Sequence, residues 1–108
     1  MEAKQVLLDG LRTYPDSIDL LTELAELASS RKDWPLAAGR WGAVLDAHGG
    51  RAPAHSLVRT VFALLSAGSF EEAEQVAHAG LQVHPRNASL IRELARIATT
   101  KTRRLTLL

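Results

Sequence analysis

The chain has 108 residues, a formal net charge of +1 and no cysteine, and 46% of its residues are hydrophobic. This length allows one domain with a modest core, and the composition is too apolar for a disordered chain. The lack of cysteine excludes disulfides, thiolate metal sites and a cysteine nucleophile. The sequence shows neither an apolar run that would span a membrane nor a signal-peptide pattern. A cytoplasmic location is favoured, and a periplasmic one stays open for a piece of a larger exported protein.

The hydrophobic pattern predicts helices along the whole chain and no strand, so the expected class is all-α. In one segment, for example, Leu21, Leu24 and Ala28 share a face at spacings of three and four residues. In chain order, the predicted helices cover residues 2–13, 17–29, 34–47, 54–66, 70–83 and 88–99. Residues 101–108 follow as a basic and apolar tail or as the start of a further helix.

Capping residues support the starts of several of these helices. The candidates are Asp16 or Ser17 for the helix at 17–29, Asp33 for the helix at 34–47, Ser69 with Glu72 as a capping box for the helix at 70–83, and Asn87 for the last helix.

One phrase of the sequence occurs twice. The segment EAKQVLLDGLRTYP at 2–15 returns as EAEQVAHAGLQVHP at 72–85, and twelve of thirty residues are identical when 2–31 is laid on 72–101. The offset of 70 is about twice the length of a 34-residue helix-turn-helix repeat, which predicts a middle copy. Two full repeats follow, at 17–47 and 54–83. The helix at 2–13 is then the second helix of a partial repeat, and the helix at 88–99 is the first helix of a further one.

Each repeat has a first helix with interleaved large and small residues, a turn, and a second helix that begins near an Ala. The matching residues are Ala3, Gly10, Leu11 and Pro15; Leu21, Leu24, Ala25, Trp34, Ala37, Trp41 and Leu45; Gly68, Phe70, Ala73, Gly80, Leu81 and Pro85; and Ile91, Leu94, Ala95 and Ala98. This layout resembles the tetratricopeptide repeat (TPR) family, with a related helical-hairpin repeat such as Sel1 or HEAT as the alternative. The resemblance implies a right-handed α-solenoid of antiparallel helix pairs with about five to six helices.

Small residues at repeated places are expected to let neighbouring helices approach closely. They are Gly10, Ala25, Ala37, Ala73, Gly80 and Ala95. Four apolar residues, Val6, Leu7, Leu94 and Ile97, are expected to face the two ends of the solenoid with little cover. Solenoid repeats need neighbours, so we expect a piece of a longer protein or a short solenoid that stacks end to end as a homo-oligomer.

The sequence predicts no enzyme, no cofactor and no metal site. The motifs GxSxG, GxxxxGK[ST], GxGxxG and HExxH are all absent. The histidines lack the spacing of zinc ligands, and the acidic residues fit exposed faces or first turns of helices. Trp34 and Trp41 lie on one side of their helix, where packing between repeats is favoured over a platform for a ligand.

By resemblance, the first helices line a concave groove. The expected groove residues are Asp19, Thr22, Glu26, Ser29, His55, Val58, Phe62, Leu65, Ser89, Arg92, Arg96 and Thr99. The expected function is a protein–protein interaction scaffold that holds a peptide or protein segment, with Phe62 as an apolar anchor and Arg92 and Arg96 near an acidic group. The competing interpretation is that the apolar members are buried by neighbouring helices and the charges only keep the face soluble.

Two other functions stay open. The chain could be a structural or oligomerisation adaptor for an attached catalytic domain, such as a bacterial glycosyltransferase or sulfotransferase. Nucleic-acid binding could use the segment after residue 85, which has six basic residues and one acidic residue. The low total charge and the lack of aromatic residues among those arginines argue against nucleic acid.

Overall fold

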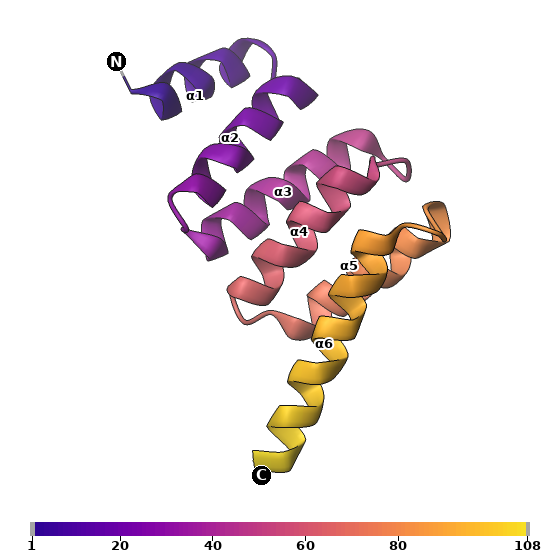
Figure 1. The fold of residues 1–108 in the computed structure, drawn as a ribbon. Coiled ribbons are helices and arrows are strands. Elements are labelled where there is room, and N and C mark those ends of the chain that lie inside the picture. The colour runs from indigo at the N-terminus through magenta and orange to yellow at the C-terminus, as the bar shows by residue number, and fades with distance from the viewer. Residues whose placement is uncertain (1, 108) are drawn as a thin grey trace.

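The computed structural model describes residues 2–107, and these residues form six α-helices and no strand (Figure 1). The helices are α1 (Ala3–Thr13), α2 (Ile18–Ser30), α3 (Trp34–His48), α4 (Ala54–Ser66), α5 (Phe70–Val83) and α6 (Ala88–Leu107). Each helix packs on the next one in sequence, and α4 also packs on α6. The helices form a helical-repeat solenoid that measures 48 × 29 × 17 Å. Six helices and no strand in residues 2–107 confirm the predicted all-α class. Within residues 2–107, no helix is both long enough and apolar enough to cross a membrane.

The predicted helices agree with the first five observed helices to within one residue, but the last one does not. Helix α6 is 20 residues long, so residues 101–107 continue it and form neither a separate tail nor a further helix. Two contacts hold this extension against α5. Lys101 Nζ lies 3.1 Å from Glu74 Oε2, and the Arg104 guanidinium stacks 5.1 Å from the centre of the Phe70 ring. Residue 108 lies outside the described part of the chain.

Two of the predicted helix caps form and two do not. Ser17 Oγ accepts a hydrogen bond from the Leu20 amide at 3.3 Å, and Asn87 Oδ1 accepts one from the Leu90 amide at 3.0 Å. Asp33 and Ser69 occupy the predicted N-cap positions, but the predicted capping by their side chains was wrong, because neither side chain accepts a hydrogen bond from its helix among the described residues. Both residues have ψ below 80°, outside the extended conformation that directs a capping side chain at the first turn.

The turns inside the two full repeats share one backbone conformation. Lys32 has a φ of 57° and Gly68 has a φ of 84°, both in the left-handed region. The amide of the following residue reaches back to the preceding helix in each turn, from Asp33 to the Ala28 carbonyl at 3.1 Å and from Ser69 to the Leu64 carbonyl at 2.8 Å. This is the Schellman pattern at a helix C-terminus, which glycine favours. The first repeat adopts it with a lysine.

Small residues bring neighbouring helices together as predicted. Ala25, Ala37 and Ala73 are fully buried. A Cβ atom added to Gly10 would lie 3.1 Å from Leu20 Cδ1, and one added to Gly80 would lie 3.1 Å from Leu90 Cδ1. These two glycines are 70 residues apart, so the repeated phrase repeats a packing contact.

The outward side of α6 differs from the prediction. Ile97 is fully buried and Leu94 is half-buried, so the expectation that both would face the open end was wrong. Both belong to the core that α6 forms with α4 and α5. The outward side instead exposes Ile91 at 49% and also exposes Ala95, which was predicted to be a close-packing residue. In α2 and α4 the equivalent residues pack on the second helix of their own repeat.

Candidate functional site

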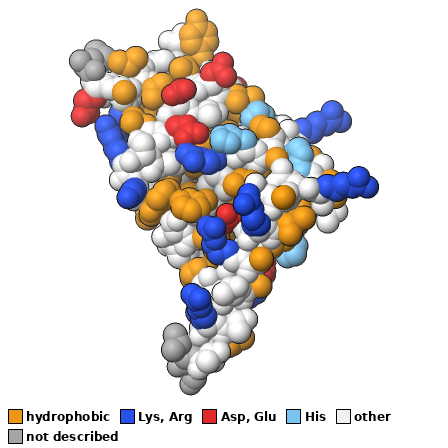
Figure 2. Space-filling model, in the orientation of Figure 1, with side chains coloured by type: hydrophobic (Ala, Val, Ile, Leu, Met, Phe, Trp, Pro, Cys, Tyr) orange, Lys and Arg blue, Asp and Glu red, His pale blue; other side chains and the backbone are white. Residues whose placement is uncertain are grey.

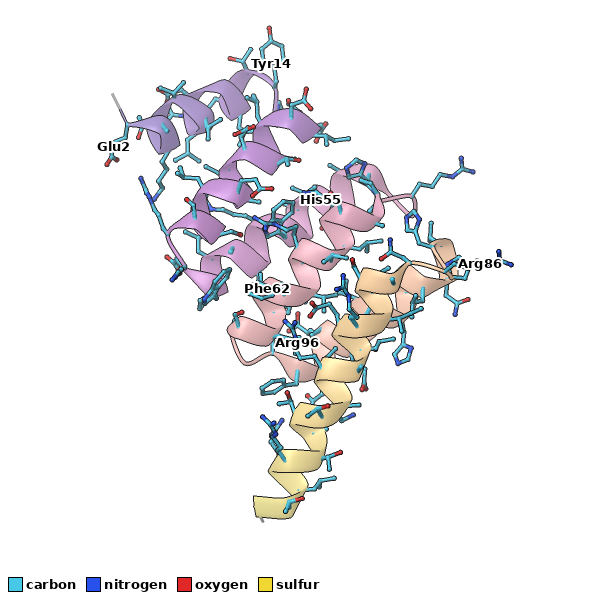
Figure 3. The ribbon with its side chains drawn as sticks, in the orientation of Figure 1. Glu2, Tyr14, His55, Phe62, Arg86 and Arg96 are labelled. Atoms are coloured by element: carbon cyan, nitrogen blue, oxygen red, sulfur yellow. The ribbon has the colours of Figure 1, made fainter. Side chains whose placement is uncertain are left out.

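The predicted groove residues come from α2, α4 and α6, and none of them is fully buried. Six are exposed: Asp19, His55, Phe62, Arg92, Arg96 and Thr99. Six are half-buried: Thr22, Glu26, Ser29, Val58, Leu65 and Ser89. Figure 3 shows His55, Phe62 and Arg96 on the same side of the molecule, and Phe62 lies between the other two. The helical spacing of three and four residues thus gives accessible stripes on three helices.

A salt bridge joins the first helices of the two full repeats. Arg59 Nη2 on α4 lies 2.5 Å from Glu26 Oε2 on α2, and His55 Nε2 lies 3.7 Å from Glu26 Oε1. Both members of the closer pair are 36–40% exposed, so the pair is solvated and its stability contribution is small. Arg59 is not among the groove residues predicted from the sequence. The available signal was its place one turn after His55, which put a basic residue beside the groove opposite Glu26.

An aromatic pair borders this salt bridge. The rings of Trp34 and Phe62 meet edge to face with centroids 5.2 Å apart, and Phe62 remains 39% exposed. Together with Glu26, Ser29 and Arg59, they line a pocket of about 160 Å³. The pocket therefore has an apolar wall and a charged wall, contributed by α2, α3 and α4.

Trp41 supports this pocket from inside the molecule. It is fully buried, and its Nε1 donates a hydrogen bond to Ser29 Oγ at 3.0 Å. The Arg59 guanidinium lies 5.8 Å from the centre of its ring. Packing was the predicted role for both tryptophans, and it is confirmed for Trp41. Trp34 is half-buried and combines packing with a place in the pocket wall.

The end of the groove at α6 is basic. Arg96 Nη1 lies 3.5 Å from Glu93 Oε1, and Arg92 Nη2 donates to Ser89 Oγ at 3.2 Å. Glu93 is buried, whereas the Arg96 side chain is 57% exposed. The guanidinium groups therefore remain accessible to a partner while one carboxylate beneath them limits their net charge. Figure 2 shows this face, with most of the acidic side chains in its upper part and several Lys and Arg side chains in its lower part.

One histidine outside the groove joins two parts of the scaffold. His84, at the end of α5, lies with Nε2 2.9 Å from the Ala52 carbonyl oxygen, which ties α5 to the loop before α4. Among residues 2–107, no group of three His, Asp or Glu side chains is placed to hold a metal ion.

No family model matches the chain, and no curated protein matches it in sequence. Solved structures of MamA, a TPR-like protein, share its fold. The structure described as MamA MSR-1 C2 has a TM-score of 0.76 and 21% identity, over 92% of this chain and 56% of the MamA chain. Two structures of a MamA point mutant have TM-scores of 0.75 and 0.78 with 22% identity, over 97% of this chain. This chain spans less than two thirds of the MamA chains that it matches. Its six helices thus form a TPR-like helical-repeat solenoid.

Proposed function

We propose that this chain is a non-catalytic scaffold that binds an extended or helical segment of a partner protein on the face formed by α2, α4 and α6. The observation that carries the proposal is the pocket between Trp34 and Phe62, where an aromatic ring stays 39% exposed beside a salt bridge. A pocket of about 160 Å³ is too small for a cofactor and suits one apolar side chain. Such a central apolar anchor surrounded by polar groups is typical of hot spots in protein interfaces.

The charges around the pocket favour a segment with an acidic residue on one side of the anchor. Arg92 and Arg96 lie on α6 and Glu26 lies on α2, and α4, which contains Phe62, runs between these two helices (Figure 1). An acidic side chain of the partner would gain charge-assisted hydrogen bonds from either guanidinium. At the other end of the groove, Arg59 is already paired with Glu26, so an acidic side chain of the partner gains more beside Arg92 and Arg96.

Selection from a random peptide library tests this function. The library is selected on the immobilised protein, and the affinity of the best binder is measured by fluorescence anisotropy. We expect Phe62→Ala to weaken binding at least tenfold, because the apolar side chain of the partner loses the Phe62 ring that forms one wall of the pocket. The matched control is Tyr14→Ala, which removes an aromatic side chain that is 65% exposed at the far end of the molecule (Figure 3). Equal affinity for Phe62→Ala and the parent chain would refute the aromatic anchor.

A second role, in assembly, is favoured by the outward side of α6. Ile91, Ala95 and Ala98 are exposed there, on the side by which α2 and α4 pack on their second helices. We propose that a second copy of the chain covers this side with the second helix of one of its repeats. Copies would then stack end to end, or would bring together the domains that are attached to them. Light scattering should show association that rises with concentration and is lost on Ile91→Asp. A monomer at every concentration would exclude the stacking.

Nucleic-acid binding has less support, because part of the basic surface of α6 is used in contacts with α5. Lys101 pairs with Glu74, and Arg104 stacks on Phe70. A mobility shift with single-stranded nucleic acid at low salt would support nucleic-acid binding.

A further inference from the structure

We propose that a pocket between α1, α2 and α3, separate from the groove, is a binding site for a short aliphatic carboxylate. The pocket has a volume of about 220 Å³. It shares no lining residue with the aromatic pocket of Trp34 and Phe62. A ligand of this size is a small acid or one terminal residue of a peptide, because sites for drug-sized molecules start at about 300 Å³.

Three basic side chains from three different parts of the fold converge on this pocket. Lys4 comes from α1, Arg31 follows the end of α2, and Arg40 comes from the middle of α3. None of the three forms a salt bridge within the described residues 2–107. Asp33 is the one acidic residue in the lining, so the pocket has an excess of positive charge.

Arg40 is the basic residue that can give a carboxylate two parallel hydrogen bonds. Its Nε atom is buried and has no hydrogen-bond acceptor in the described part of the chain, so a ligand in the open pocket does not reach that atom. A carboxylate would instead accept from the two terminal Nη atoms of the guanidinium, in the bidentate geometry that arginine favours.

The remaining lining is apolar and decides which anion fits. Leu24 and Ala28 are buried in the floor, and Leu27 and Leu36 complete it. Inorganic phosphate would lose hydration against these side chains, whereas an aliphatic stem gains from the contact. The N-terminus of α3 borders the pocket through Asp33 and Leu36, and the Asp33 carboxylate offsets the positive end of the helix dipole there. The site therefore matches one negative charge on a branched apolar stem.

The test is a titration of the 15N-labelled chain with 4-methylpentanoate, followed by NMR at low ionic strength. We expect saturable shifts of amides in α1, α2 and α3 with a dissociation constant of about 1 mM, the scale of a ligand with one charge and a few carbons. The amide of the same acid, 4-methylpentanamide, should give no saturable shifts. A short peptide with a C-terminal leucine separates the two sources of the carboxylate, since the tighter of the two probes identifies the natural form.

Two variants and one control complete the experiment. Arg40→Gln should weaken binding about tenfold, because the ligand loses its charged bidentate partner. Lys4→Gln should weaken it less and leaves α3 unchanged, so the result does not depend on how well Arg40→Gln folds. Arg86→Gln removes the same charge from the opposite end of the solenoid (Figure 3) and should leave the affinity unchanged. The proposal is overturned if no amide shifts saturate, if the uncharged amide binds equally well, or if inorganic phosphate binds as tightly as the acid.

Discussion

Arg59 on α4 reaches Glu26 on α2 and at the same time lies over the ring of Trp41, so one side chain joins the groove surface to the buried core. The pair is partly exposed, which keeps its electrostatic contribution small. The cation–π contact and the packing of the arginine stem add to it. These three contributions act between successive repeats, where a solenoid depends on contacts between neighbours.

The first prediction concerns this arginine. Arg59→Ala should lower the free energy of unfolding by about 1 kcal/mol, from the lost ion pair and the lost contact with Trp41. Urea unfolding followed by circular dichroism measures the change. Arg92→Ala, whose arginine is exposed on α6, serves as the control and should change stability by less than about 0.5 kcal/mol. Equal losses for the two variants would show that Arg59 does not connect the repeats.

A second prediction uses the left-handed turns. Lys32 has a φ of 57° at the place where the next repeat has Gly68. Lys32→Gly should therefore raise stability by about 0.5 kcal/mol, since relief of the left-handed strain exceeds the added chain entropy. Gly68→Ala should lower it by about 1 kcal/mol for the reverse reason. The thermal midpoints of the two variants should move in opposite directions, and a shift of both in the same direction would contradict the argument.

A third prediction contrasts two glycines inside helices. A Cβ on Gly39 meets nothing within 4 Å, so Gly39→Ala should stabilise the chain by up to about 1 kcal/mol through helix propensity. A Cβ on Gly80 would lie 3.1 Å from Leu90 and 3.3 Å from Leu57, so Gly80→Val should destabilise it by about 1–3 kcal/mol. Denaturant midpoints measure both changes. A neutral Gly80→Val would mean that α5 and α6 shift apart without loss.

A fourth prediction concerns the hydrogen bond between Trp41 and Ser29. Ser29→Ala leaves the buried Trp41 Nε1 without an acceptor and should cost about 1–3 kcal/mol of stability. Ser30→Ala on the same helix is the control, because the Ser30 hydroxyl is exposed and donates only to the Leu27 carbonyl of its own helix. Intrinsic fluorescence should show a changed emission for Ser29→Ala alone. An unchanged stability would mean that water replaces the serine.

The helices and the repeat were predictable from the sequence because apolar spacing and turn residues are local signals. Gly10 and Gly80 could be identified as packing residues since the same phrase surrounds both. The length of α6 could not be predicted, because it depends on Lys101 and Arg104 reaching Glu74 and Phe70 across the fold.

The candidate groove was predictable as a set of faces but not as a site. The repeat register gave the exposed positions of α2, α4 and α6. It did not indicate that Arg59 pairs with Glu26 or that Trp34 meets Phe62, because these contacts depend on the distance between helices. The burial of the Arg40 Nε atom could not be predicted either, because it depends on how α1, α2 and α3 pack around that side chain.

Helix α1 buries none of its described residues completely, and its close contact with α2 rests on Gly10 and Leu20. It should therefore open more readily than the rest of the solenoid, and its amides should exchange with solvent faster than those of α3 and α4. Lys4 belongs to this weakly held helix and also lines the basic pocket. Anything that occupies the pocket will slow amide exchange in α1 first, so the order of this helix reports on ligand binding at a distance from the groove.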